Sequence, residues 1–71
     1  MKVLIVGSGG REHALSWKIS KSPLVKEIFV APGNGGTELE TSIINVNIQA
    51  DDIEGLAQFA INKQIDLTII G

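Results

Sequence analysis

The sequence predicts an α/β fold built on a parallel sheet, and three observations support this class. The apolar runs at residues 3–6, 28–31 and 67–70 are near-continuous, as in strands that are covered on both faces. Segments with helical periodicity lie between these runs. A glycine-rich turn directly follows the first run, which is typical of the first strand–helix unit of nucleotide- and phosphate-binding folds.

The size and composition of the chain exclude several classes of protein. A chain of 71 residues is at most one small domain, so we expect residues 1–71 to be one domain, or the first part of one, in a longer protein. The net charge is −2 and Arg11 is the only arginine, so we expect no nucleic acid partner. No apolar run approaches the roughly 18 residues of a membrane span, so we expect no membrane partner.

Two further features bear on the compartment of the protein. The chain contains no cysteine, which excludes disulfides and thiolate chemistry and agrees with a reducing environment. Met1 and Lys2 lead directly into a strand rather than into a cleavable leader. We therefore expect a cytoplasmic protein.

The first predicted unit is a strand over residues 2–6 followed by a helix. The helix is predicted to begin near Gly10 or Arg11 and to end at about Lys21, before Ser22-Pro23, because proline disfavours helical geometry in the residue that precedes it. Ala14 and Trp17 are spaced to pack on the sheet.

The second strand is predicted over residues 28–31, where Pro32 stops it. A second glycine-rich loop follows at residues 32–37. Ile44, Val46 and Ile48 alternate with polar residues, which predicts an edge strand exposed on one side.

The second helix is predicted to start after Asp51 or Asp52 and to close at residues 62–64. We interpret the two aspartates as a helix cap rather than a metal site. Gly55 within this helix costs about 1 kcal/mol relative to alanine, with close packing as its only evident reason. The predicted buried stripe comprises Ile53, Leu56, Ala57, Ala60 and Ile61.

These elements predict one arrangement of the sheet. The element order predicts a parallel sheet with right-handed crossovers. The apolar run of the first strand places that strand in the middle, with strands two and three on one side and strand four on the other. The spatial order is then 3-2-1-4, with the sheet incomplete at the C-terminal edge. Both glycine-rich loops then lie at one edge, beside the switch point between strands one and four, where such sheets bind ligands.

The first loop does not fit the two best-known nucleotide motifs. In a dinucleotide-binding G-x-G-x-x-G turn, the third glycine would occupy the position of Glu12. The acidic residue expected after the second strand is also missing, because Ala31-Pro32 stands there. No G-K-[ST] follows the turn, which excludes a P-loop.

The residues instead predict a short cradle for a phosphorylated sugar that carries an amine. Gly9 and Gly10 offer backbone N–H groups at a helix N-terminus, and Arg11 adds a positive charge for the phosphate. Glu12 supplies a carboxylate for the amine, although a glutamate in the first turn also suits the helix dipole. The second wall of the predicted site comprises Gly33, Asn34 and Gly35.

His13, beside this cradle, has a different interpretation. We expect His13 to be structural rather than a catalytic base, and we identify no catalytic, cofactor-binding or metal-binding residue in this segment.

The motifs at residues 7–15 (GSGGREHAL) and 31–37 (APGNGGT), together with DLTIIG at residues 66–71, resemble the amino-terminal domain of the phosphoribosylamine–glycine ligases. These glycinamide ribonucleotide synthetases belong to the ATP-grasp superfamily. The resemblance covers essentially the whole chain. One departure is Ser8, where asparagine is common in the family.

The resemblance implies a Rossmann-like fold of the pre-ATP-grasp type and a role in purine biosynthesis. The parent enzyme would use ATP and Mg²⁺ (or Mn²⁺), bound outside this segment, to join glycine to 5-phosphoribosylamine. The segment would help to bind the phosphoribosyl substrate beside the remainder of its own chain, and alone it is expected to be inactive.

Two other classes stay open from the residues alone. One is a non-catalytic nucleotide-binding or regulatory module with a Rossmann-like fold. The other is the front end of a dinucleotide-dependent oxidoreductase, which Glu12 and Ala31-Pro32 disfavour.

Overall fold

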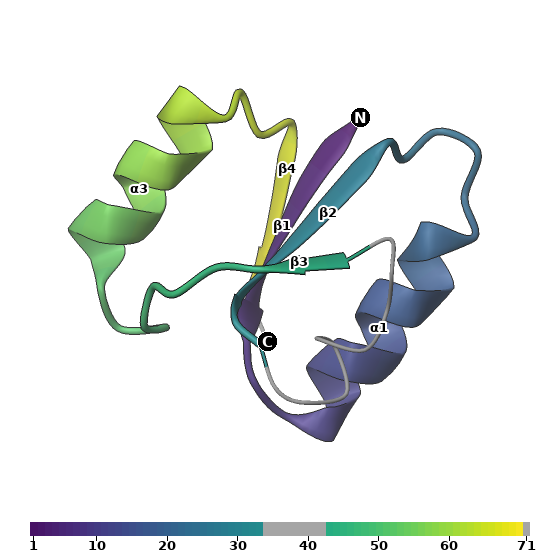
Figure 1. Cartoon of the computed structure of the whole chain (residues 1–71), viewed down its shortest axis with the longest axis horizontal. Helices are drawn as coiled ribbons and strands as arrows, with labels where there is room; N and C mark the ends of the chain where they lie inside the picture. The colour runs from purple at the N-terminus through teal and green to yellow at the C-terminus, as the bar shows by residue number, and fades with distance from the viewer. Residues whose placement is uncertain (34–42, 71) are drawn as a thin grey trace.

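A computed structural model describes residues 1–33 and 43–70 (Figure 1). Its elements, in chain order, are β1 (Lys2–Gly7), α1 (Gly10–Ser20), β2 (Glu27–Pro32), β3 (Ile43–Asn45), α3 (Ile53–Asn62) and β4 (Leu67–Ile70). The strands form one 4-stranded sheet in the order β3-β2-β1-β4, and every pairing is parallel. The predicted α/β class and strand order are confirmed.

β1 is the centre of the sheet because it pairs with β2 on one side and with β4 on the other. Its side chains alternate between two hydrophobic cores, one on each face of the sheet. Val3 and Ile5 join the core covered by α1, whereas Leu4 and Val6 join the core covered by α3. Figure 1 shows the two helices on opposite faces of the sheet. The alternation of β1 side chains explains why a continuous apolar run is needed there.

α1 packs on the sheet through a different face from the one predicted. Leu15 and Ile19 pack against the core, and Ser16 is fully buried. The prediction that Ala14 and Trp17 face the sheet is wrong: Ala14 is exposed and Trp17 is 48% exposed, with Lys21 Nζ 4.9 Å from its ring centroid. Because Ser16 is small, α1 can lie close to the sheet at this residue. The Ser16 hydroxyl donates to the His13 carbonyl at 2.8 Å.

β3 is an edge strand, as predicted, but it is short. It spans Ile43–Asn45, and the Val46 N–H donates to the Val30 carbonyl at 2.9 Å just beyond it. Ile43 is buried in the core beneath α1, while Val46 and Ile48 pack against the opposite core. Ile44 is half exposed because no further strand lies beyond β3 in the described sheet.

α3 also rests on the sheet through a face rotated from the predicted stripe. Leu56 is buried as expected, but Ile53 and Ile61 are each 71% exposed. Phe59, which was outside the predicted stripe, packs edge-on against Phe29 with 5.1 Å between ring centroids. Such edge-to-face ring pairs are favourable, and the face of α3 that carries Phe59 packs against the core.

The edge of the sheet at the amino ends of the strands is tied by hydrogen bonds around Lys2. Its N–H donates to Asp66 Oδ2 at 2.8 Å, and the Asp66 N–H donates back to the Lys2 carbonyl at 2.9 Å. Lys2 Nζ donates to the Lys63 carbonyl at 3.1 Å and lies 3.9 Å from Glu27 Oε1. These contacts join β1 to β4 and β2 at the end of the sheet opposite the glycine-rich loops.

The start of α3 gives a reason for Gly55. Asp52 is the N-cap, and its Oδ1 accepts a hydrogen bond from the Gly55 N–H at 3.0 Å. A Cβ added at Gly55 would lie 2.5 Å from Asp52 Oδ2. The capping carboxylate therefore occupies the space that a side chain at residue 55 would need.

We predict that Gly55→Ala and Asp52→Ala are coupled in their effects on stability. Asp52→Ala removes the cap and lowers the free energy of unfolding by about 1 kcal/mol. In the unaltered chain, Gly55→Ala is near neutral, because its helix propensity gain is offset by displacement of the cap. In the Asp52→Ala background, Gly55→Ala stabilises the chain by about 1 kcal/mol. Urea unfolding of the four proteins measures the coupling, and strictly additive effects would contradict this account of Gly55.

Candidate functional site

Both glycine-rich loops begin at the carboxyl edge of the sheet. β1 ends at Gly7 and β2 ends at Pro32, and these two residues are partners in the parallel register. The Gly33 N–H donates to the Gly7 carbonyl at 3.1 Å, which joins the two loops where they leave the strands. Gly33 has φ +76, a conformation that favours glycine.

The structure brings together only part of the predicted second wall. Gly33 lies beside the first loop, as the predicted strand order requires. Asn34 and Gly35 lie outside the described residues, so their roles stay predictions.

The first loop leads into α1 without a side-chain cap. Gly9 is the N-cap and has extended backbone geometry, and no side chain caps the helix at this residue. Gly9, Gly10 and Arg11 are all exposed. The first-turn N–H groups of a helix have no partner within the helix, and they lie at the positive end of its dipole. This edge of the sheet therefore offers donors and positive charge to an anion.

Glu12 is buried beneath this turn, with 8% of its surface exposed. A Cβ added at Gly7 would lie 2.5 Å from Glu12 Cγ and 2.8 Å from Oε1, and one added at Gly9 would lie 2.8 Å from Oε2. The Glu12 carboxylate thus fills the concave side of the turn between β1 and α1. Its position in the first turn of α1 also suits the helix dipole. This packing role is shown by the geometry, and contact with a ligand amine stays a prediction.

A cavity of about 370 Å³ opens between α1 and β4, at the switch point of the sheet. Arg11, Glu12 and Leu15 line it from α1, and Ile69 and Ile70 line it from β4. The three apolar residues were not predicted as walls of the site. The signal that identifies them is the strand order, because β4 must end beside the first loop when β1 lies between β2 and β4.

His13 has contacts consistent with a structural part in the turn. Its N–H donates to the Gly9 carbonyl at 3.2 Å, and its own carbonyl accepts from Ser16. The side chain is half-buried. These backbone contacts help to hold the first turn of α1 over β1.

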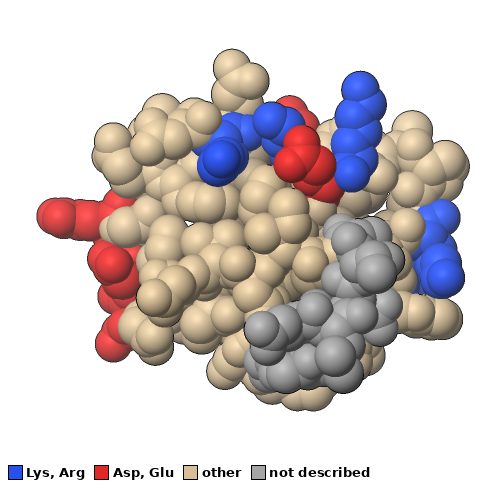
Figure 2. Space-filling model, viewed as in Figure 1, with Lys and Arg blue, Asp and Glu red and all other residues tan. Residues whose placement is uncertain are grey.

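The distribution of charge gives no extended basic surface in the view shown. Figure 2 shows blue and red side chains interspersed at the top of the view, and a second group of acidic side chains at the left, over the start of α3, where Asp51, Asp52 and Glu54 lie. Within residues 1–33 and 43–70, no group of three or more His, Cys, Asp or Glu residues is placed to hold a metal ion. None of the helices in the described part of the chain is long and apolar enough to cross a membrane.

We predict that the turn tolerates alanine at Gly10 but not at Gly7. Gly7 has φ +148, and an added Cβ would clash with the buried Glu12 side chain, so Gly7→Ala lowers the free energy of unfolding by at least about 2 kcal/mol. Gly10 has no atom within 4 Å of an added Cβ, so Gly10→Ala changes it by less than about 0.5 kcal/mol. Urea unfolding followed by circular dichroism compares the two variants, and equal effects would refute the packing described for Glu12.

Comparison with known proteins assigns this arrangement to a family. The model of the family described as phosphoribosylglycinamide synthetase, N domain, matches residues 1–71. Proteins named phosphoribosylamine–glycine ligase align with the whole chain, at 63% identity in Allochromatium vinosum and at 61% in Haemophilus influenzae and Escherichia coli K12. The chain spans 17% of the length of each of these relatives. The chain belongs to the phosphoribosylglycinamide synthetase N-domain family.

Proposed function

We propose that this chain is the N-terminal, substrate-side domain of an ATP-dependent ligase that joins glycine to 5-phosphoribosylamine in purine biosynthesis. The observation that carries the proposal is the 61–63% identity to proteins named for that activity, which extends over both glycine-rich loops. A cytoplasmic location belongs to the same proposal.

The chemistry of the parent enzyme would proceed in two steps. The glycine carboxylate takes the γ-phosphoryl group of ATP and becomes glycyl phosphate. The amine of 5-phosphoribosylamine then attacks the acyl carbon, the amide C–N bond forms, and inorganic phosphate leaves. ATP and Mg²⁺ (or Mn²⁺) would be bound by the remainder of the polypeptide, outside this segment.

The part of this segment would be to hold the phosphoribosyl substrate. The first-turn N–H groups of α1, at Gly9 and Gly10, would donate to the substrate phosphate, and Arg11 would pair with its charge. The Glu12 carboxylate, beneath the turn, would lie on the side of the amine. Gly33, with Asn34 and Gly35, would form the facing wall. The segment would supply no catalytic group, so alone it would bind substrate without turnover.

The non-catalytic module is not supported, since the relatives that align with the whole chain are named as ligases. The geometry also disfavours a dinucleotide site. β2 ends in Ala31-Pro32, where a dinucleotide-binding fold has an acidic residue for the ribose.

We predict that Arg11→Ala in the complete enzyme weakens binding of the phosphoribosyl substrate and leaves ATP unaffected. A charge-assisted hydrogen bond contributes about 1.5–3 kcal/mol, so KM for 5-phosphoribosylamine rises roughly 10- to 100-fold. Steady-state kinetics with each substrate varied in turn measures the effect.

The matched control is Lys18→Ala, which removes a cation of the same helix at its opposite end. We expect this variant to retain the KM of the unaltered enzyme for both substrates. An unchanged KM for 5-phosphoribosylamine in Arg11→Ala, or an equal rise in Lys18→Ala, would refute the role of Arg11.

A further inference from the structure

The cavity between α1 and β4 has two chemically different parts. The part formed by the first turn of α1 is polar, with Arg11 and Glu12. The other part is aliphatic, with Leu15 from the next turn of α1 and Ile69 from β4. The volume of about 370 Å³ lies within the range of small-molecule sites, roughly 300–1,000 Å³. The cavity therefore suits a ligand that has both a polar and an apolar part.

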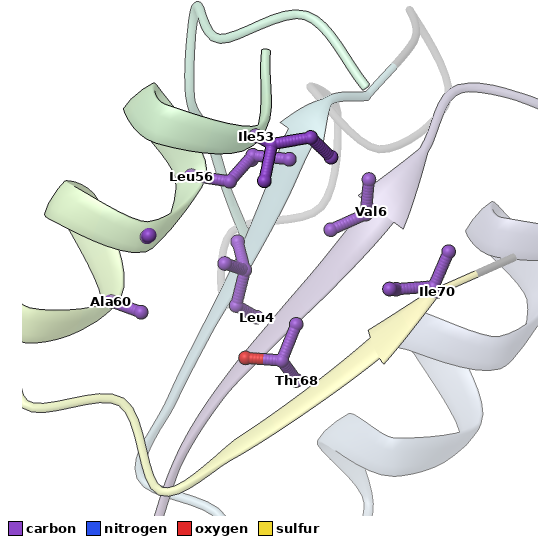
Figure 3. A pocket seen from close by; sticks show the side chains of 8 residues that line it. Leu4, Val6, Ile53, Leu56, Ala60, Thr68 and Ile70 are labelled. Atoms are coloured by element: carbon purple, nitrogen blue, oxygen red, sulfur yellow. The ribbon is translucent and has the colours of Figure 1, made fainter. Parts of the chain in front are cut away.

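Ile69 is the β4 residue of this cavity whose side chain faces α1. It pairs in register with Ile5 and packs against the core beneath α1, to which Ile5 belongs. Figure 3 shows the side chains of Thr68 and Ile70 around a separate groove, which lies under α3 on the opposite face of the sheet. A change of the side chain at residue 69 therefore alters the cavity beside α1 and leaves that groove as it is.

The Glu12 carboxylate is a second sign of a ligand in this cavity. Glu12 is 8% exposed, and it lines the cavity. Within residues 1–33 and 43–70 its carboxylate forms no ion pair, with Arg11 or with another cation, and it accepts no hydrogen bond. A buried acceptor without a donor costs free energy. A ligand with an amine or hydroxyl donor on this side would supply the missing hydrogen bond.

The aliphatic part of the cavity has no counterpart in 5-phosphoribosylamine. Every carbon of that sugar carries oxygen or nitrogen, so the substrate offers no apolar surface to Leu15 and Ile69. A nucleoside 5′-monophosphate keeps the same phosphoribosyl group and carries a flat base in place of the amine. The face of a base gains free energy when it leaves water for an apolar surface. The two parts of the cavity together therefore match a nucleotide more completely than they match the substrate.

We propose that this site also binds nucleoside 5′-monophosphates, in competition with 5-phosphoribosylamine. The phosphate lies at the start of α1 beside Arg11, a ribose hydroxyl donates to Glu12, and the base packs between Leu15 and Ile69. A dinucleotide is not a ligand, because the start of α1 takes a terminal phosphate and both phosphates of a dinucleotide are internal. This proposal rests on the proposed function, since both place a phosphoribosyl group at the start of α1.

The test is a calorimetric titration of the complete enzyme with AMP, and with ribose 5-phosphate as the reference that lacks a base. The ATP site is first filled with Mg²⁺ and a non-hydrolysable ATP analogue, so that AMP cannot bind there. We expect AMP to bind about 10-fold more tightly than ribose 5-phosphate, because the base is removed from water against the aliphatic wall. Excess ribose 5-phosphate is expected to displace AMP.

A pair of variants locates the contact with the base. Ile69→Phe fills the aliphatic part of the cavity with a ring, so the ratio of the two dissociation constants falls from about 10 to about 1. The matched variant is Leu67→Phe, because Leu67 is 47% exposed, pairs with Val3 of the same core and lies outside the cavity. We expect Leu67→Phe to keep the ratio of the unaltered enzyme. If Ile69→Phe prevents folding, Ile69→Ala, which removes most of this wall, is compared with Leu67→Ala.

Three results would overturn the proposal. They are AMP that binds no more tightly than ribose 5-phosphate, a ratio that Ile69→Phe leaves unchanged, and loss of all AMP binding once the ATP site is filled. Failure of the proposed function gives a different result. In that case ribose 5-phosphate itself does not bind, or Arg11→Ala leaves its affinity unchanged.

Discussion

The packing of Glu12 against the turn between β1 and α1 is the contact on which the rest of the site depends. The Glu12 side chain fills the space next to Gly7 and Gly9, so neither position has room for a Cβ while that side chain stays in place. This packing places the first turn of α1 directly above the end of the central strand. The start of α1 therefore lies at the carboxyl edge of the sheet, where β1 ends.

The second constraint is the join between the two loops. The hydrogen bond from Gly33 to Gly7 makes the two loops leave the sheet side by side, and the strand order sets β4 on the opposite flank of β1. An anion at the start of α1 would therefore lie between Gly33 and the cavity that Ile69 and Ile70 help to line. Backbone donors, one arginine and aliphatic walls together suit a phosphorylated sugar better than a bare anion.

Much of the fold could be predicted because it rests on features that are local in the sequence. The continuous apolar runs identify strands buried on both faces, and the run of the first strand indicates that it lies inside the sheet. The rotation of each helix could not be predicted, because it depends on contacts between elements. On α3, Phe59 packs against Phe29 of β2. On α1, the small Ser16 is fully buried against the sheet, whereas Trp17 lies on the exposed side of the helix.

In the candidate site, too, some features are local in the sequence and others depend on contacts between elements. The glycines and Arg11 could be identified from their order after the first strand, whereas the burial of Glu12 and the aliphatic walls of the cavity depend on how α1 sits over β1 and β4. Gly55 is a further example. The Asp52 carboxylate, three residues earlier, occupies the space that a side chain at residue 55 would need. Helix propensities do not include such a contact.

The most direct test of a phosphoribosyl site at the start of α1 is an NMR titration of the ¹⁵N-labelled chain with glycinamide ribonucleotide, with NAD(H) in a parallel titration. The account predicts that the ribonucleotide shifts the backbone amide signals of Gly9, Gly10 and Arg11 in a saturable manner, and that NAD(H) does not. Saturable shifts of these amides with NAD(H), and none with glycinamide ribonucleotide, would contradict it.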